Sequence, residues 1–269
     1  YGGRFLPRLS KPMRDRYGLT VLSHNTGQNL PGYENRYRLI ADIDADIVLL
    51  QEITEEFIQS YGSVLTVKYP YAAIGPGQED RNQKVGMGIL SKYPIIDVSD
   101  FKLVEDGLVF QQRVVIDYKG SNIAVYNIHT TFPWLYLRNN STFNHIRIPV
   151  YDDITRRDEI NALQNLIKNE QLPVILGGDF NFGDQSDDYR KLRNAGLVDA
   201  YRNVGYGFGF TWPVNRTPSV NIKPALPFIR VDYIFHSPSF HPIAAKVIHE
   251  TGSDHRPIWA ELQLHFSDH

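Results

Sequence analysis

Short apolar segments that end in polar side chains alternate with amphipathic segments along most of this chain. The segments 19–25 and 46–52 have the length and composition of buried strands, and residues 33–45 between them have helical spacing. The same kind of segment returns later, where strands are expected at 122–129 and 172–181. Strands and helices in this alternation form α/β domains, in which helices cover the faces of a sheet. We therefore expect an α/β fold.

The remaining elements are predicted in the same way, from the spacing of apolar residues and from the turn residues that separate them. Further strands are expected at 84–90, 112–118, 230–237 and 257–264, and further helices at 151–169 and 187–196. In the longer helix, five apolar residues share roughly one face: Ile154, Ile160, Leu163, Leu166 and Ile167. Two stretches, 132–150 and 203–229, show no regular period and are expected to be irregular.

The size and composition of the chain fit one large domain, which we expect to span 19–269. With 269 residues, of which 42% are hydrophobic, the chain can bury about three quarters of its unfolded surface in a single core. The formal net charge of −2 provides no global basic field of the kind that attracts nucleic acid. The absence of cysteine excludes disulfides, thiolate zinc sites and a cysteine nucleophile.

Residues 1–18 differ from the rest of the chain in their charge. The segment contains five basic residues and one acid: Arg4, Arg8, Lys11, Arg14, Arg16 and Asp15. It fits either a solvent-exposed basic tail or a juxtamembrane linker, since basic residues cluster beside membrane spans. The second interpretation predicts membrane association through an upstream segment and an extracytoplasmic or membrane-anchored domain, whereas the first fits the cytoplasm. No run of 18 apolar residues occurs in the chain.

Polar residues stand where most of the expected strands end. These candidate site residues are Asn25, Glu52, His129, Asp179, Asn181, Asp232, Asp254 and His255. Each one alone is ordinary, because polar side chains are common where a strand meets a loop. Taken together they indicate a site, since α/β proteins assemble their sites at strand ends. The set is rich in oxygen ligands and has no thiols, which favours Mg²⁺ or Mn²⁺ over zinc.

Asp232 is the residue of this set that is hardest to explain structurally, because it interrupts the apolar run "FIRVDYIF". A buried carboxylate needs a partner, and His255 is the candidate, since an aspartate fixes the tautomer of an imidazole and favours its charged form. A positively charged imidazole beside a metal fits stabilisation of a phosphorane-like transition state. The pair therefore points to attack of water on phosphorus.

The segment "GGDFN" at 177–181 combines two glycines with an acid and an amide. The glycines permit close backbone approach and unusual dihedral angles. On an extended segment, Asp179 and Asn181 point the same way and can address one ligand. The alternative is an Asx-type turn that follows the strand.

Seven motifs occur in an order that resembles the endonuclease/exonuclease/phosphatase superfamily. They are "HN", "LLQE", "YNIH", R-x-x-E-x-x-x-L at 156–163, "LGGDFN", "RVDYIF" and "SDHRP". The resemblance begins at about residue 19 and continues to the end of the chain. It implies a deoxyribonuclease I-like fold: a four-layer α/β-sandwich in which two packed, mostly antiparallel sheets are flanked by helices. It also implies a metal-dependent phosphoesterase site along one edge of the sandwich.

The same resemblance implies a metal site that holds Mg²⁺ or Mn²⁺. By matching position, Glu52 would bind the metal, Asn25 would help to organise the site and contact substrate, and Asp254 would lie near it.

The resemblance also implies catalytic roles. Asp179 would orient or deprotonate the attacking water, and Asn181 would contact the phosphate. His255, oriented by Asp232, would hold the scissile phosphate, and His129 would be a second imidazole at that phosphate, acting as an acid or a ligand.

Departures from the superfamily pattern bear on the substrate. Gly27 and Thr54 stand where abasic-site endonucleases carry an acid and a lysine, and "PVILGGDFNFGD" is a poor match to inositol-polyphosphate phosphatases. The stretch 206–215 and the basic N-terminus are more similar to bacterial members whose catalytic domain follows membrane segments. In "FPWLYLR", Trp134 and Tyr136 are candidate substrate-binding residues, which would stack on a base or enter a lipid interface, unless they pack on the sandwich.

The leading hypothesis is a monomeric, metal-dependent phosphodiesterase that hydrolyses a phosphate ester by in-line attack of water and is nuclease-like. A phospholipid or sphingomyelin-type phosphodiesterase and a small-molecule phosphomonoesterase are the alternatives within the same chemistry. A non-catalytic binding module on the same fold is the alternative from another class, and the retention of all the expected catalytic positions argues against it.

Overall fold

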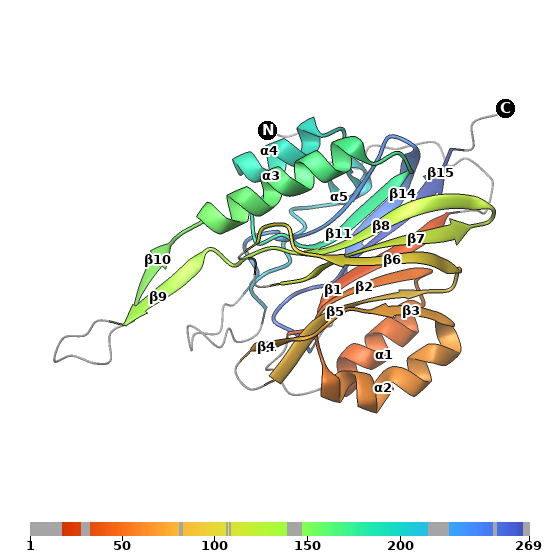
Figure 1. Ribbon diagram of the computed structural model, residues 1–269, viewed down its shortest axis with the longest axis horizontal. Coiled ribbons are helices and arrows are strands. Elements are labelled where there is room, and N and C mark those ends of the chain that lie inside the picture. The colour runs from red at the N-terminus through yellow and green to blue at the C-terminus, as the bar shows by residue number, and fades with distance from the viewer. Residues whose placement is uncertain are drawn as a thin grey trace.

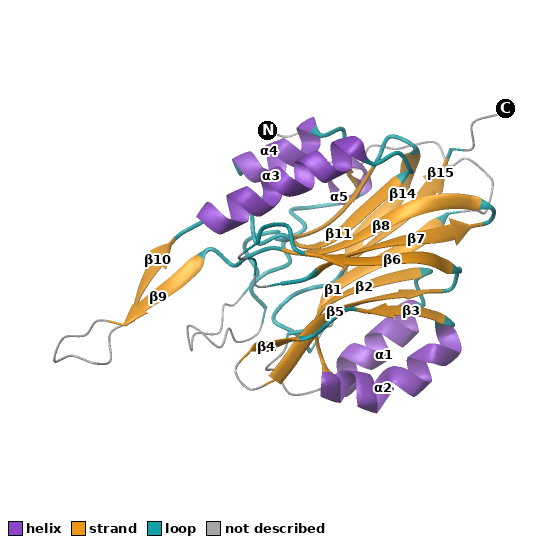
Figure 2. Ribbon diagram, in the orientation of Figure 1, coloured by secondary structure: helices purple, strands orange, loops and turns teal. Residues whose placement is uncertain are grey.

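The computed structural model describes residues 18–27, 33–80, 83–105, 107, 109–138, 147–214, 226–249 and 252–265. Of the basic N-terminal segment 1–18, all but Gly18 lies outside these residues. The described residues form two large sheets, a separate two-stranded hairpin and five helices (Figures 1 and 2).

The first large sheet has seven strands in the order β14-β15-β1-β2-β5-β3, with β4 paired to β5. Its strands are β1 (Leu19–Asn25), β2 (Ile47–Thr54), β3 (Tyr71–Ile74), β4 (Gln78–Asp80), β5 (Gln83–Ser91), β14 (Phe240–Val247) and β15 (Ile258–Leu264). The second has six strands in the order β12-β13-β11-β8-β7-β6. Its strands are β6 (Ile95–Phe101), β7 (Gln111–Tyr118), β8 (Ser121–His129), β11 (Val174–Asp179), β12 (Val198–Asp199) and β13 (Asp232–His236).

Each large sheet contains one parallel pair among otherwise antiparallel neighbours. In the first sheet β1 runs parallel to β2, and in the second β8 runs parallel to β11. The carboxyl ends of parallel strands lie at the same edge of a sheet. The register places Asn25 beside Gln51 in the first pair and Asp179 beside His129 in the second. The polar ends of four strands are thereby brought to one edge of the sandwich.

Helices cover the outer face of each sheet and complete four layers. The helices are α1 (Tyr33–Ile43), α2 (Glu55–Lys68), α3 (Ile154–Asn169), α4 (Asp187–Asn194) and α5 (Ala200–Val204). Figure 1 shows α1 and α2 beneath the first sheet and α3 and α4 above the second. A buried apolar cluster that includes Val21, Leu49, Val125 and Ile175 fills the space between the sheets. The predicted mostly antiparallel α/β-sandwich is therefore confirmed. Within the described residues, no helix has the length and apolar content needed to span a membrane.

The expectation of irregular structure over 132–150 is wrong for part of that stretch. Residues Trp134–Arg138 form β9 and residues Arg147–Tyr151 form β10, and the two pair antiparallel. This hairpin extends away from the sandwich (Figure 1). Its strands pair only with each other, and Pro149 lies within β10, so the sequence lacks the regular alternation of a strand with one buried face.

Helix α2 was not expected from the sequence, because "EEFIQSYGSVLTVK" contains Gly62 and several β-branched residues of low helix propensity. The structure supplies two compensations. The Thr54 hydroxyl caps the helix by accepting a hydrogen bond from the Phe57 amide at 3.2 Å. Phe57 and Leu65 are buried against the first sheet, so packing stabilises a segment that its own propensity does not.

A buried histidine at the end of β13 makes the stability of the fold sensitive to acid. Burial lowers the pKa of His236 to about 4, whereas a histidine in the unfolded chain titrates near about 6.5. The unfolded state therefore binds more protons between these values. From this group alone, the free energy of unfolding falls by about 1.4 kcal/mol per pH unit as the pH drops through that window.

We expect His236→Asn to flatten the acid side of the stability profile by about this slope, measured by urea unfolding between about pH 4.5 and pH 7. His241→Asn, a change at an exposed histidine on β14, is the matched control. Identical slopes for the two variants would rule His236 out as the source.

Candidate active site

The buried amide of Asn25 links the two sheets at their shared edge. Its Nδ2 donates to Glu52 Oε1 at 3.0 Å on the neighbouring strand β2. It also donates to Asp179 Oδ2 at 3.0 Å, on β11 of the opposite sheet. Its Oδ1 accepts the amide of Gly27 at 3.0 Å, which fixes the orientation of the side chain. Two carboxylates that are remote in sequence are thus held on one amide group.

Glu52 lies in an unusual backbone conformation. Its φ is +56°, and the register of β2 against β5 shifts between Leu50 and Ile53, which marks a β-bulge. A left-handed residue other than glycine costs on the order of 1 kcal/mol or more and persists where the surroundings enforce it. Bulges redirect a side chain relative to the sheet. At Glu52 the bulge coincides with the residue whose carboxylate meets Asn25.

The glycine pair before Asp179 is required by close backbone approach. Gly178 has a φ of +146°, and a Cβ added there would lie 1.8 Å from the Ile128 carbonyl oxygen on β8. A Cβ at Gly177 would lie 2.6 Å from Leu49 Cδ1 in the opposite sheet. Gly178 therefore excludes a larger side chain, whereas at Gly177 the Leu49 side chain would have to move to make room for one. The two glycines therefore let β11 approach its neighbours closely just before the acid.

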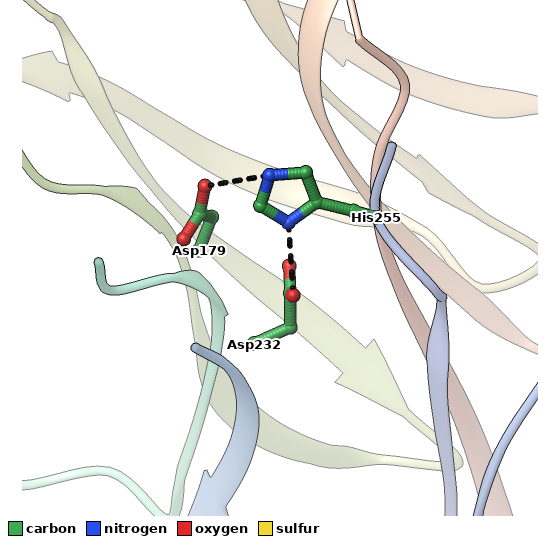
Figure 3. Close-up of side chains that lie close together, drawn as sticks. All are labelled: Asp179, Asp232 and His255. Atoms are coloured by element: carbon green, nitrogen blue, oxygen red, sulfur yellow. Dashed lines mark hydrogen bonds and ion pairs between the residues drawn. The ribbon is translucent and has the colours of Figure 1, made fainter. Parts of the chain in front are cut away.

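Asp179, His255 and Asp232 form a line of three buried side chains (Figure 3). His255 Nδ1 lies 3.0 Å from Asp232 Oδ2, and His255 Nε2 lies 3.7 Å from Asp179 Oδ2. Burial by itself lowers the pKa of an imidazole, but the two facing carboxylates outweigh it and raise the pKa of His255 well above its ordinary value. Burial raises the pKa of Asp179, an effect that the two neighbouring imidazoles partly offset.

A second imidazole approaches the same carboxylate oxygen. His129 Nε2 lies 3.6 Å from Asp179 Oδ2 and 3.8 Å from Glu52 Oε1. The main chain of His129 is held by Gln111, whose Oε1 accepts its amide at 2.7 Å and whose Nε2 donates to its carbonyl at 3.0 Å. Asp179 Oδ2 is thus surrounded by an amide and two imidazoles.

Asn181 forms the Asx-type turn that was the alternative interpretation of the "GGDFN" segment, and a ligand shared by Asp179 and Asn181 stays a prediction. Its amide donates to Asp179 Oδ1 at 3.1 Å, which is the contact of an Asx-type turn. Its side-chain Nδ2 donates to the Thr130 carbonyl at 2.8 Å, on the loop after His129. One oxygen of Asp179 therefore maintains the turn, and the other faces the imidazoles.

Asp254 lies beside this group. Its carbonyl accepts the amide of Val214 at 2.8 Å. Burial, with the charge of Glu52 nearby, raises the pKa of the Asp254 carboxyl, although His255 partly offsets this. The site therefore gathers several carboxylates around two imidazoles.

The structure thus brings together eight of the predicted site residues: Asn25, Glu52, His129, Asp179, Asn181, Asp232, Asp254 and His255. Trp134 and Tyr136 contribute backbone to β9, and their side chains lie outside the described part of the structure.

The sequence analysis missed residues that support these side chains. Ser253 Oγ donates to the Asn25 carbonyl at 2.8 Å and accepts the His255 amide at 3.1 Å, so it joins the end of β1 to the loop that precedes β15. Gln111 and Thr211 have similar supporting roles, and Thr211 Oγ1 accepts the Asp232 amide at 3.2 Å. Each is a common polar residue in a loop or at a strand end, and its sequence carries no signal of its role.

Aromatic residues beside His255 were also missed. The Trp212 ring lies 6.4 Å from the His255 ring, 6.0 Å from Phe132 and 6.3 Å from Phe228, measured between centroids. Phe132 and Phe228 are 39% and 62% exposed, so this aromatic wall (Phe132, Trp212 and Phe228) is open to solvent. The run "FGFTWP" was the signal in the sequence.

Comparison with known proteins places this geometry in context. A family model described as the Endonuclease/Exonuclease/phosphatase family matches residues 23–255. No curated protein sequence matches the chain significantly. An endonuclease/exonuclease/phosphatase family protein from Leptotrichia buccalis superposes with a TM-score of 0.69 at 18% identity, covering 91% of this chain and 100% of that one.

Two further solved structures have a similar fold. A mannosyl-6-phosphatase from Bacteroides thetaiotaomicron has a TM-score of 0.65 at 23% identity, covering 91% of this chain and 100% of that one. D. rerio TDP2 complexed with single strand DNA product has a TM-score of 0.64 at 18% identity, covering 91% and 99%.

At these identities the superpositions show a shared fold. The family model goes further, because its matched span of 23–255 covers most of the chain and includes every residue gathered at the sheet edge. The chain belongs to the endonuclease/exonuclease/phosphatase family, whose enzymes hydrolyse phosphoric esters and generally depend on a divalent metal.

Proposed function

We propose that this protein is a Mg²⁺- or Mn²⁺-dependent phosphodiesterase that hydrolyses a nucleotide-containing diester by in-line attack of water. The observation that carries the proposal is the surrounding of Asp179. One oxygen of this buried carboxylate faces both His129 and His255 within 4 Å, and His255 is in turn held by Asp232. This arrangement pairs a base with charged and hydrogen-bonding groups that can stabilise a phosphoryl transition state.

The residues that would hold the metal are Glu52 and Asp254, with Asn25 orienting Glu52. Their oxygen-only chemistry suits Mg²⁺ or Mn²⁺. Burial raises the pKa of the Asp254 carboxyl and the charge of Glu52 adds to this effect, so a cation held between the two groups would favour their charged forms. When bound, the metal supplies Lewis-acid neutralisation of the phosphate charge.

Atoms of Asp179, Asp232 and His255 also lie within 4.8 Å of one another, a spacing that metal ligands share. His255 is a poor ligand here, however. Its Nδ1 is engaged with Asp232, and the two carboxylates favour its protonated form, which has no lone pair to offer. We therefore assign proton transfer and stabilisation of the phosphate charge to these three residues, and not metal binding.

The chain's own groups divide the remaining work. Asp179 accepts a proton from the attacking water, and its raised pKa brings a carboxylate closer to the range of an effective base. His255, charged and oriented by Asp232, donates to a phosphoryl oxygen. His129 lies on the other side of Asp179 and contacts the phosphate from there. The second N–H of the Asn181 side-chain amide donates to a phosphoryl oxygen.

The aromatic wall favours a substrate that carries a flat or apolar group next to the phosphate. Stacking on an exposed aromatic side chain is worth about 1–3 kcal/mol per base. One of the solved structures that share this fold holds single strand DNA product, and another is a mannosyl-6-phosphatase, so proteins of this fold differ in their ligands. Phospholipid diesters and small phosphomonoesters are the alternatives that the experiment must separate.

The test is a substrate panel in one Mg²⁺ buffer, repeated with Mn²⁺ and with EDTA. It compares single-stranded DNA, duplex DNA, RNA, sphingomyelin, phosphoinositides, bis-p-nitrophenyl phosphate and p-nitrophenyl phosphate. We expect metal-dependent turnover, with the diester preferred to the monoester and nucleic acid preferred to lipid. Preference for p-nitrophenyl phosphate would assign a phosphomonoesterase, and selective cleavage of sphingomyelin would assign a lipid phosphodiesterase. No turnover of any substrate with either metal would favour a binding module.

Replacing Glu52 by glutamine tests the metal site. We expect Glu52→Gln to raise the Mg²⁺ concentration needed for half-maximal activity by at least about tenfold, because one carboxylate ligand and its charge are lost. The measurement is a metal titration of bis-p-nitrophenyl phosphate turnover. Glu56→Gln, at an exposed acid in the first turn of α2, is the control. An unchanged titration of Glu52→Gln would place the metal elsewhere.

A further inference from the structure

Helix α3 presents two buried charged side chains to the loops of the site. Their hydrogen bonds are to neighbours of the site residues, and Glu159 also lies close enough to His129 for their charges to interact. Arg156 is 3% exposed and Glu159 is 1% exposed. They are the arginine and glutamate of the R-x-x-E motif, which the proposed chemistry leaves without a role. Buried charges are costly unless they are paired and hydrogen-bonded, so their partners indicate what they do.

The guanidinium of Arg156 is engaged on every side. Its Nε donates to Asp188 Oδ2 at 3.2 Å, on α4. One terminal nitrogen donates to Tyr151 Oη at 3.0 Å and to Asp153 Oδ2 at 3.2 Å. The other donates to the main-chain carbonyl of Asn181 at 2.8 Å. Because the first three contacts fix the planar group, the fourth fixes the position of the Asn181 carbonyl.

The position of that carbonyl matters because of the conformation of Asn181. This residue has a φ of +50°, in the left-handed region that costs free energy for a residue other than glycine. Its amide donates to Asp179 Oδ1 at 3.1 Å. The direction of the amide depends on the same backbone turn whose carbonyl Arg156 holds. Arg156 thereby influences the orientation of the Asp179 carboxylate, although it does not contact that carboxylate.

Glu159, one turn further along α3, holds the other catalytic loop. Its two oxygens accept the Thr131 amide at 2.7 Å and the Thr131 hydroxyl at 2.9 Å, two residues after His129. The loops are also joined directly, since Asn181 Nδ2 donates to the Thr130 carbonyl. A single helix therefore sets both loops relative to each other.

We propose that Arg156 is a positioning residue of the hydrolysis: through the main chain of Asn181 it orients Asp179 toward the attacking water. The inference rests on the proposed function, because it assigns Arg156 a role through the base of that reaction. The same guanidinium contacts Tyr151 at the base of the β9–β10 hairpin, which leaves the sandwich beside the start of α3 (Figure 2). The position of the hairpin base and the geometry of the site thus share one anchor.

The experiment compares Arg156→Lys with Arg157→Lys on bis-p-nitrophenyl phosphate. Arg157 is the matched control, because it is adjacent, exposed, and bonded to Asp153 but to neither Asn181 nor Tyr151. A lysine at 156 keeps the charge but cannot reach all four acceptors. We expect Arg156→Lys to lower kcat by about tenfold or more with KM changed less than about threefold, and Arg157→Lys to match the wild type.

A double-mutant cycle separates positioning from general support of the fold. If Arg156 acts through Asp179, adding Arg156→Lys to Asp179→Asn should lower the residual kcat by less than about threefold. A purely structural role would multiply the two losses, and that result would overturn the inference. So would a kcat of Arg156→Lys within twofold of the wild type.

Asp188→Asn provides a second variant in case Arg156→Lys does not fold. It preserves the shape of the side chain but replaces the carboxylate that accepts the hydrogen bond of Arg156 Nε with a neutral amide. The same kcat loss with an unchanged KM supports the inference, and wild-type kcat in the folded variant overturns it. Full activity of Asp179→Asn would instead defeat the proposed function itself, which keeps the two failures distinct.

Discussion

Replacing Asp179 by asparagine is expected to lower kcat by about three orders of magnitude while KM changes little. Asparagine preserves the shape of the side chain but cannot accept a proton from water, and general-base catalysis contributes about 10²–10⁴-fold. The amide contact from Asn181 to Oδ1 can persist, so the loop should retain its geometry. The measurement is steady-state kinetics on bis-p-nitrophenyl phosphate with saturating Mg²⁺.

The control for this change is Asp187→Asn. Asp187 is an exposed acid in the first turn of α4, the helix that follows β11 in the chain. It removes the same charge at a short distance in sequence and should leave kcat unaltered. If Asp179→Asn lowered kcat by less than about tenfold, Asp179 would not be the base, and another carboxylate of the site would have to take that role.

Replacing His255 by glutamine is the second change with a large expected effect. We expect kcat to fall by about 10²–10³-fold, the range seen when one preorganised donor to a developing anion is removed. Asp179 and Asp232 would then face each other without the imidazole between them, and the charge of Asp232 would raise the pKa of Asp179 further. The fold must therefore be verified by circular dichroism before the kinetics are compared.

Asp232→Asn should give a smaller loss than His255→Gln, because the imidazole remains but its charge and orientation are less strongly supported. His249→Gln, at an exposed histidine, is the control. Equal activity of His255→Gln and His249→Gln would show that the imidazole at 255 does not act on the phosphate.

Much of the fold was predictable because its strands carry their own pattern. The strand at 19–25 coincides with β1, and the helix expected at 151–169 contains α3. Helix α2 and the β9–β10 hairpin are among the elements that escaped prediction. Helix α2 is stabilised by Phe57 and Leu65 against the first sheet rather than by its own propensity, and among the described residues β9 and β10 pair with each other and with no strand of the large sheets.

The candidate site divides in the same way. Asn25, Glu52 and Asp179 were found because they end apolar strands, where a polar residue is visible against its surroundings. The left-handed backbone of Glu52 and the role of Arg156 were not foreseen. Both depend on main-chain geometry, a bulge within β2 for Glu52 and the turn after β11 for the proposed role of Arg156, and no local pattern of side chains records it.

The 3.0 Å contact from Asn25 to Asp179 has a consequence for folding experiments, because it joins one half of the sandwich to the other. Neither half alone contains both a carboxylate of the proposed metal site and the proposed base, Asp179. A chain in which only one sheet has formed should hydrolyse nothing, however native its spectrum. The return of turnover after dilution from denaturant would then time the docking of the two halves, and spectroscopic signals that return earlier would time the formation of each half.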